Sequence, residues 1–312
     1  MTIAQNDMTD PAVRWDGPIV MVANPGSGRN SHDAEVIDKV QQALGADLRW
    51  VQPGSDIGDT ALQASRDGAG LVLSCGGDGT AMAVASALLG SGTPVGILPF
   101  GTFNYFARGQ GLSEDPVEAA QQIANGQVKE MPLAKVNDQV FLNNVSIGIY
   151  PTILREREDI YARWGRRRVL AYWSVIKTFL RFRKPLKVTI DHGTGPQVHR
   201  TALVFVGRSA YQFARFGLEG TEAIRDGGFA VLVIKAATRW ELFKATARLT
   251  LRSTAMGKDY ELITTDRLTI SVDGGRRTLI AYDGEKRHDK GTLTIAMSDE
   301  KLHLVRPLDE AA

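Results

Sequence analysis

Continuous apolar runs separated by helical patterns make up the first part of the chain. The runs that indicate strands are residues 18–23, 47–52, 70–75 and 93–100, and the helical patterns cover 31–44, 58–68, 80–89 and 113–125. Strands of a parallel sheet are buried on both faces, so their sequences show little alternation. This pattern predicts a three-layer α/β domain with a mainly parallel sheet, and Ser113 is the predicted N-cap of its last helix.

From about Lys129 the pattern changes to alternating polar and apolar positions, which is typical of antiparallel strands. Two helical stretches, roughly 152–184 and 239–256, interrupt the alternation. We therefore expect an α/β domain at 17–130 followed by an antiparallel β-sandwich at 131–299. The last predicted strand, 300–307, fits either domain.

The composition is that of a soluble globular protein, with 43% hydrophobic and 23% charged residues in 312. A net charge of +2 gives no argument for nucleic acid as a partner. The single cysteine, Cys75, excludes an intrachain disulfide and a thiolate metal cluster, and we interpret it as a buried strand-end residue. Residues 1–17 do not read as a secretion signal, and no apolar run is long enough to span a membrane. The expected location is the cytoplasm, with peripheral membrane association.

Three glycine-rich turns follow predicted strands of the first domain: "NPGSGRN" from Asn24, "CGGDGT" from Cys75 and "PFGTFNYFAR" from Pro99. Ligands of open α/β sheets bind at the carboxyl edge of the strands, where glycines let backbone N–H groups approach phosphate. Packing alone gives no reason for Asp78 in the second turn. The three turns together predict a polyphosphate site. The sequence lacks the Walker, Rossmann, GxSxG, HExxH and protein-kinase motifs.

The ordered set "NPGSG", "GGDGT" and "GTFNYFAR", followed by "FLNNVSIGIYP" and "DGEKR", resembles the diacylglycerol kinase and sphingosine kinase superfamily, in particular its bacterial lipid-kinase branch. The resemblance covers about residues 18–307. It implies an ATP-binding α/β domain and a β-sandwich lipid domain. In such proteins the γ-phosphate passes to a lipid hydroxyl in the cleft between the two domains.

Carried over position by position, the resemblance implies a set of site residues. Those expected to bind the nucleotide are Asn24, Ser27, Gly28, Gly76, Gly77, Gly79, Thr80, Thr102 and Asn104. The acidic motif is Asp283–Gly284–Glu285, although Asp-Gly is also a common hairpin turn. Phosphoryl transfer needs a metal and a carboxylate near the attacking hydroxyl. The family pattern favours Glu285 as the catalytic base and Asp78 for the Mg²⁺ and phosphate network, with the reverse assignment left open.

The chain departs from the family pattern at three places. Tyr105 stands where the family often has Asp. In "IRDGGFA" only Asp226 remains of an acidic group that the family links to a second, structural Mg²⁺. "VGRSAY" stands where asparagines are common. These changes affect the substrate and metal details more than the fold.

Residues 163–187 hold nine Lys or Arg and no acid, and 165–184 read as an amphipathic helix ended by Pro185. Arg166, Lys177, Arg181 and Lys184 fall on one narrow face. One interpretation is a helix that packs on the sandwich with a solvated basic face. The other is an interfacial helix that binds an anionic membrane surface, which would suit a kinase with a lipid substrate.

Two other functions remain open at the level of sequence. One is an NAD kinase-like enzyme with a soluble acceptor, because "GGDGT" occurs in NAD kinases too. The other is a non-catalytic lipid- or nucleotide-binding module. The identity of the lipid (diacylglycerol, ceramide, a sphingoid base or another) is open, and so is the oligomeric state, a homodimer included.

Overall fold

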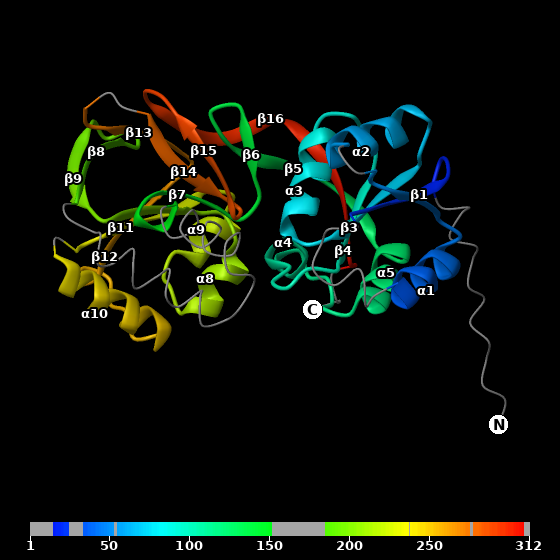
Figure 1. Cartoon of the computed structure of the whole chain (residues 1–312), viewed down its shortest axis with the longest axis horizontal. Helices are drawn as coiled ribbons and strands as arrows, with labels where there is room; N and C mark the ends of the chain where they lie inside the picture. Colours follow the sequence, from blue (N-terminus) through cyan, green and yellow to red (C-terminus); the bar gives the residue numbers. More distant parts are fainter. Residues whose placement is uncertain are drawn as a thin grey trace. The chain divides into compact units, whose positions relative to one another are not determined.

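A computed structural model describes residues 15–24, 34–52, 55–151, 185–236, 238–274 and 277–308 (Figure 1). The chain forms two compact units. Unit 1 runs to Leu133 and resumes at Asp299, and unit 2 spans Ala134–Ser298. Two strands, β5 (Gln127–Val136) and β16 (Leu293–Arg306), contribute residues to both units.

The sheet of unit 1 is built from parallel strands. Its members are β1 (Ile19–Ala23), β2 (Asp47–Trp50), β3 (Leu71–Gly76) and β4 (Val95–Pro99), in the order β2-β1-β3-β4. The last part of β16 extends the sheet by pairing in parallel with β4, at Leu304 and Val95. Every residue of β1, β3 and β4 is buried, which is why these segments read as continuous apolar runs.

Helices cover this sheet. They are α1 (Ala34–Leu44), α2 (Ile57–Arg66), α3 (Asp78–Ala87), α4 (Tyr105–Gly109) and α5 (Pro116–Ala124). In Figure 1, α2 and α3 lie together on one side of the strands, and α1 and α5 lie together on the other. The N-cap predicted at Ser113 is wrong. Asp115 caps α5 by accepting hydrogen bonds from the backbone of Val117 and Glu118, and Pro116 takes the first helical position.

Unit 2 contains two antiparallel layers. One has the order β12-β11-β10-β7-β14-β15, and the other pairs β8 with β9 and β13, and β13 with the first part of β16. The strands are β6 (Gln139–Phe141), β7 (Asn144–Gly148), β8 (Leu186–Asp191), β9 (Gln197–Thr201), β10 (Leu203–Gly207), β11 (Phe229–Ile234), β12 (Tyr260–Thr265), β13 (Arg267–Val272), β14 (Thr278–Tyr282) and β15 (Glu285–Asp289).

The two layers of unit 2 share one apolar core. Val145, Val206 and Ile280 enter it from the first layer, and Ile190 and Leu268 enter it from the second. Inward-facing apolar residues alternate with polar ones along such strands, as the sequence pattern indicated. The predicted fold class is therefore confirmed: an α/β domain with a mainly parallel sheet, and a β-sandwich.

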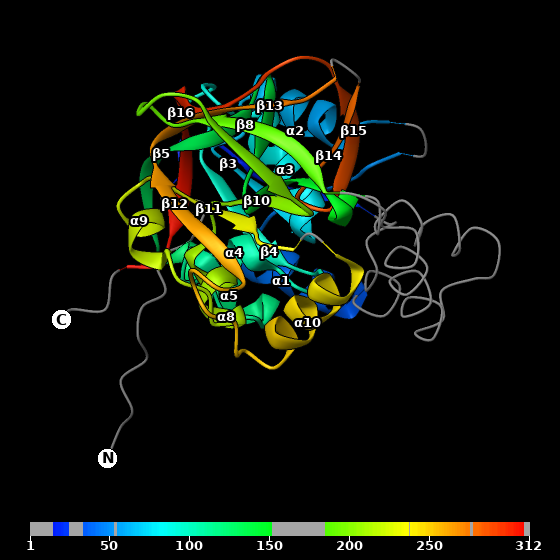
Figure 2. The same cartoon turned by 90° about the vertical axis from the view of Figure 1, so that its left-hand side faces the viewer.

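Three described helices decorate unit 2: α8 (Ala210–Phe216), α9 (Thr221–Arg225) and α10 (Arg239–Thr250). Only α10 was predicted, and it ends before residue 256. Figure 2 views the molecule from the side on which α10 lies in front. The predicted helix 165–184 lies outside the described residues. None of the helices in the described ranges is long and apolar enough to cross a membrane.

Candidate functional site

The turns after β3 and β4 meet at the carboxyl edge of the unit 1 sheet. β3 and β4 are neighbours, and Gly76 pairs with Pro99 at their ends. A Cβ built on Gly101 would lie 2.4 Å from the Cα of Gly77, so the two turns touch backbone to backbone. Gly77 and Gly101 are therefore required by the packing of one turn on the other.

The glycines of "CGGDGT" differ in what surrounds them. A Cβ on Gly76 would lie 2.3 Å from Oγ1 of Thr80, so the Thr80 side chain leaves no room for any side chain at this position. A Cβ on Gly79 would meet nothing within 4 Å. Gly79 lies in the first turn of α3, where glycine costs about 1 kcal/mol relative to alanine. Local packing thus does not explain Gly79, whereas the close approach of a ligand would.

The N-terminus of α3 has no side-chain cap. Its N-cap is Gly77, whereas α2 and α10 are capped by the side chains of Asp56 and Thr238. The first N–H groups of a helix need acceptors, and they favour anions. An α-helix that begins at a glycine turn on this edge of a parallel sheet has the geometry of a phosphate site.

The Asp78 carboxylate joins the two turns. Its Oδ1 accepts a hydrogen bond from the Phe106 backbone at 2.9 Å, and its Oδ2 accepts one from Tyr105 at 3.2 Å. Asp78 therefore caps α4, a contact that sequence reasoning missed because it links residues 27 and 28 positions apart. Carboxylate oxygens are also ligands that Mg²⁺ prefers, so the residue type is compatible with a cation ligand.

Asn104 shapes the turn after β4 from within. It adopts the left-handed conformation, with φ of 50°. Its buried side chain accepts from Gly101 N at 2.9 Å and donates to the carbonyls of Pro99 and Gly101. Thr102 and Phe103, which lie between Gly101 and Asn104, are exposed. The Phe103 and Tyr105 rings stack with their centroids 5.4 Å apart. Asn104 thus holds the loop, while Thr102 is open to solvent.

The first predicted turn is described only at its start. Asn24 follows the last residue of β1 and is half-buried, with its backbone N–H directed at the carbonyl of Cys75. Ser27 and Gly28 lie outside the described residues. Thr80 is buried in α3. Cys75 is fully buried, and burial raises the pKa of its thiol, which agrees with a strand-end residue without a reactive role.

The acidic motif forms a two-residue hairpin in unit 2. Tyr282 pairs with Glu285, and both central residues have positive φ, 46° at Asp283 and 93° at Gly284. Two consecutive positive φ values match a type I′ turn, which explains the Asp-Gly pair. The turn leaves Glu285 exposed at the first position of β15.

The Asp283 side chain has a structural role that the sequence did not reveal. Its carboxylate accepts hydrogen bonds from the backbones of Leu142, Asn143 and Asn144 at 2.5, 2.8 and 3.0 Å. The blocks "FLNNVSIGIYP" and "DGEKR" therefore lie together. Asp283 fixes the hairpin on which Glu285 stands.

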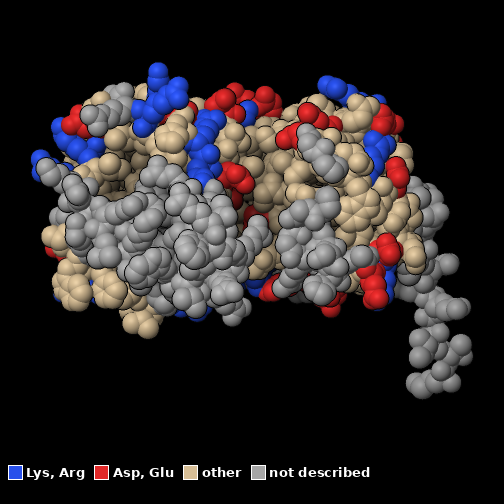
Figure 3. Space-filling model, in the orientation of Figure 1, with Lys and Arg blue, Asp and Glu red and all other residues tan. Residues whose placement is uncertain are grey.

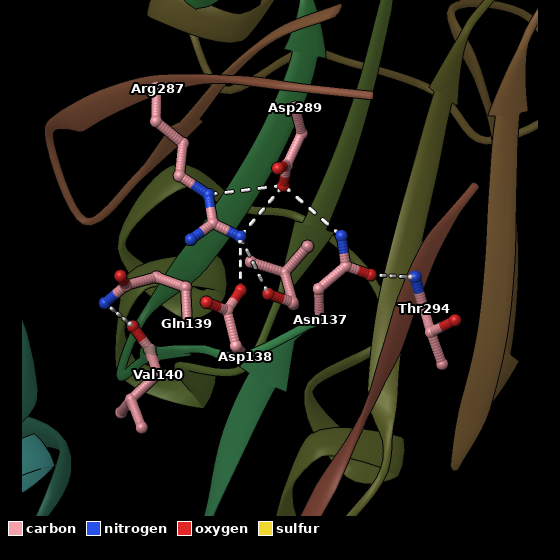
Figure 4. Close-up of polar contacts among 8 residues, drawn as sticks. Asn137, Asp138, Gln139, Val140, Arg287, Asp289 and Thr294 are labelled. Carbon is pink, nitrogen blue, oxygen red and sulfur yellow. Dashed lines mark hydrogen bonds and ion pairs between the residues drawn. The ribbon is translucent and has the colours of Figure 1, made fainter. Parts of the chain in front are cut away.

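A second polar cluster anchors β15 (Figure 4). The Arg287 guanidinium donates to Asp138 at 3.0 Å, to Asp289 at 2.8 Å and to the Val136 carbonyl at 3.4 Å. The hydrogen bond from Arg287 holds the pKa of the Asp138 carboxyl below its ordinary value. Arg287 lies two residues after Glu285, so it ties the strand that carries Glu285 to the β5–β6 turn.

The same cluster extends to β16 through Asn137, which has a left-handed φ of 54°. Its Oδ1 accepts from the Thr294 backbone at 2.9 Å, and its Nδ2 donates to Asp289 at 3.3 Å (Figure 4). Asp289 is thereby shared between Arg287 and Asn137. The start of β16 and the end of β15 are thus held to the same turn.

Asp226 is the C-cap residue of α9. Across the described ranges, no three His, Cys, Asp or Glu side chains gather as a metal group. Near Asp226 the Arg208 side chain donates to the Ile224 carbonyl at 2.9 Å, and burial lowers the pKa of Arg208. A structural metal at Asp226 stays a prediction.

Comparisons with known proteins agree with these features. Residues 18–136 match the family described as "Diacylglycerol kinase catalytic domain". The chain is 26% identical over 274 residues to a diacylglycerol kinase of Bacillus subtilis (strain 168), covering 85% of this chain and 88% of that protein. It is 26% identical over 192 residues to a diacylglycerol kinase of Mycobacterium tuberculosis (strain ATCC 25618 / H37Rv), covering 56% of this chain and 60% of that one.

A solved structure of a diacylglycerol kinase from Bacillus anthracis str. Sterne has the same fold, with a TM-score of 0.65. The alignment covers 94% of this chain and 97% of that one at 16% identity. The matched segment 18–136 contains both glycine turns whose contact is described above. Residues 18–136 therefore match the diacylglycerol kinase catalytic domain family, and over most of its length the chain is similar to a bacterial diacylglycerol kinase.

Proposed function

We propose that this protein is an ATP-dependent lipid kinase. It transfers the γ-phosphate of ATP to the hydroxyl of a diacylglycerol-like or sphingoid lipid, ceramide included. The observation that carries the proposal is the glycine turn at α3, which has no side-chain cap and leaves open space beside Gly79. It lies in the segment that matches the diacylglycerol kinase catalytic domain.

ATP phosphates bind at the first turn of α3. The backbone N–H groups after Gly77 supply donors, and the missing side chain of Gly79 lets phosphate oxygens come close. Asp78 holds the neighbouring turn in register through Tyr105 and Phe106. Thr102 is exposed on that turn and lies within the predicted nucleotide set.

The two acids differ in their surroundings, and this supports different roles. The Asp78 carboxylate is oriented by two backbone N–H groups, which suits a fixed ligand of phosphate-bound Mg²⁺. Glu285 is exposed at the hairpin, which suits a base that meets a substrate hydroxyl. We therefore assign Glu285 as the base and Asp78 as the metal-side residue. Bound Mg²⁺ would offset the charge of the phosphates.

Unit 2 contains the residues that we propose to act on the lipid substrate. Asp283 and Arg287 hold the hairpin and strand that carry Glu285. Residues 163–187, mostly outside the described ranges, would contact an anionic membrane surface through Arg166, Lys177 and Arg181. The protein would then act from the cytoplasm as a peripheral enzyme.

An acceptor panel tests the proposed function. The purified protein is incubated with Mg²⁺ and ATP labelled at the γ-phosphate, separately with diacylglycerol, ceramide, sphingosine and NAD. Label is expected in at least one lipid and not in NAD. Label in NAD alone would establish the soluble-acceptor function instead. Label in no acceptor, together with ATP binding, would favour a non-catalytic module.

A further inference from the structure

Helix α10 has two faces of different character. Leu242 is 4% exposed and packs in a small cluster with Ile149, Ala202 and Ala236. On the other face Trp240 is 64% exposed and Phe243 is 51% exposed. Single exposed apolar side chains are common on proteins, but a contiguous group of them often marks an interaction site.

The exposed residues form one stripe along the helix. At about 100° per residue, Trp240, Phe243, Ala247 and Leu251 fall within about 80° of one another, and Leu242 falls on the opposite side. Leu251, at the C-cap, is 76% exposed. Figure 1 draws α10 at the outer rim of unit 2, and tan side chains gather there in Figure 3. We call Trp240, Phe243 and Leu251 the α10 stripe.

The stripe combines aromatic rings with a cation. The Trp240 and Phe243 rings stack with centroids 5.4 Å apart, and the Lys244 ammonium lies 5.5 Å from the centre of the Trp240 ring. Tryptophan and lysine share a preference for the membrane–water boundary. Their apolar parts enter the acyl region while the polar ends stay at the headgroups.

The surrounding charge favours an anionic partner. Residues 238–259 contain five Lys or Arg and two acids, Glu241 and Asp259. Both acids are engaged within the protein. Glu241 accepts from the Thr238 backbone in the capping box at 3.1 Å, and the buried Asp259 pairs with Arg248. Lys244, Arg252 and Lys258 are exposed.

We propose that the α10 stripe is a membrane-docking surface for anionic bilayers. Trp240, Phe243 and Leu251 enter the interface, and Lys244, Arg252 and Lys258 face the anionic headgroups. This is the amphipathic arrangement of interfacial helices. The α10 stripe contains none of residues 163–187, and its binding requires no ATP and no acceptor lipid. It therefore stands or fails independently of the proposed catalytic function.

Co-sedimentation with vesicles tests this surface. The full chain is mixed with phosphatidylglycerol–phosphatidylcholine vesicles that contain no acceptor lipid, and with phosphatidylcholine vesicles alone. We expect the Trp240→Ala/Phe243→Ala variant to bind the anionic vesicles at least about tenfold more weakly. Burial of one aromatic side chain contributes binding free energy equivalent to roughly a tenfold change in affinity. Lys244→Glu should weaken binding to the anionic vesicles only.

Val198→Ser is the matched control, because Val198 is 61% exposed on β9 in the same unit and lies outside the stripe. This variant should bind as the wild type does. A second readout is the blue shift of tryptophan fluorescence on vesicle addition, part of which Trp240→Phe should remove.

Three results would overturn the proposal. One is unchanged vesicle binding by the folded double variant. Another is a large loss of thermal stability in Trp240→Ala/Phe243→Ala, which would mean that another part of this chain covers the stripe. The third is a dimer that the double variant dissociates, which would make the stripe an interface between copies.

Discussion

At the scale of single residues, Gly79 is a glycine that ligand binding explains and local packing does not. Open space surrounds the position of its missing Cβ, whereas Gly76 faces Thr80 at 2.3 Å. We expect Gly79→Ala to leave thermal stability unchanged or raise it slightly, by up to about 1 kcal/mol. The same change should raise KM for ATP about tenfold or more, because the new methyl group occupies the phosphate approach.

Gly76→Ala provides the contrast for that measurement. Its Cβ would collide with the Thr80 side chain, so it should lower the melting temperature. Calorimetry and initial rates on both variants give the comparison. An unchanged KM for ATP in Gly79→Ala would speak against phosphate binding at this turn.

The Asp283 side chain stabilises unit 2 by accepting hydrogen bonds from backbone groups that are distant in the sequence. An asparagine there keeps one acceptor oxygen but brings an NH₂ group toward backbone N–H donors. We expect Asp283→Asn to destabilise unit 2 by about 1–3 kcal/mol. Denaturant unfolding measures the effect, with Asp266→Asn, at an exposed turn of the same unit, as the control. Equal stability of the two variants would contradict the role given to Asp283.

The sequence could predict the Asp-Gly turn but not its partners. A positive-φ hairpin follows from local preference. The three backbone donors, at Leu142, Asn143 and Asn144, lie 139 to 141 residues away from Asp283, and no local sequence pattern indicates them. Asp78 is a similar case, since its bonds to Tyr105 and Phe106 depend on β3 and β4 being neighbours. Side-chain roles that depend on tertiary contact were the part that sequence reasoning missed.

At the scale of elements, the β15 anchor couples stability to pH. The hydrogen bond from Arg287 lowers the pKa of Asp138 in the folded protein from its ordinary value of 3.8. A carboxyl with a lowered folded pKa adds stability above the unfolded pKa, and this stability is lost as pH falls through the folded value. The Asp138 contribution should therefore be present at neutral pH and fade below about pH 4.

We expect Asp138→Asn to be less stable than the wild type at neutral pH, by at most about 1 kcal/mol because the Asp138 side chain is exposed. The difference should shrink in acid, where the wild-type carboxyl is protonated. Unfolding curves at neutral pH and near pH 3 measure it. A difference that grows in acid would contradict the pairing.

Elements whose faces are fully buried were predictable, and short helices were not. β1, β3 and β4 appear as apolar runs because the sheet is covered on both sides. Helices α8 and α9 are seven and five residues long, too short for a helical period to stand out. α8 is held by tertiary packing. The Phe213 ring packs directly on Gly207, where an added Cβ would lie 1.9 Å from the ring.

At the scale of the whole molecule, the two proposed catalytic acids belong to different units. Asp78 lies in unit 1 and Glu285 in unit 2. On the proposed assignment, the reaction needs one acid from each unit. We therefore expect Glu285→Gln to lower kcat by about 10²- to 10⁴-fold, the scale of a lost base. Asp78→Asn should also lower kcat, because it weakens the proposed Mg²⁺ and phosphate network. Asp266→Asn, an exposed acid outside the motifs, should keep wild-type kcat.

Transfer of labelled γ-phosphate from ATP into a total lipid extract is the most direct test of the lipid kinase function. The wild-type protein with Mg²⁺ should place label in an organic-phase product, and Glu285→Gln should reduce that label about 10²-fold or more. Absence of lipid label with the wild type, or equal label with wild type and both Asp78→Asn and Glu285→Gln, would contradict the account.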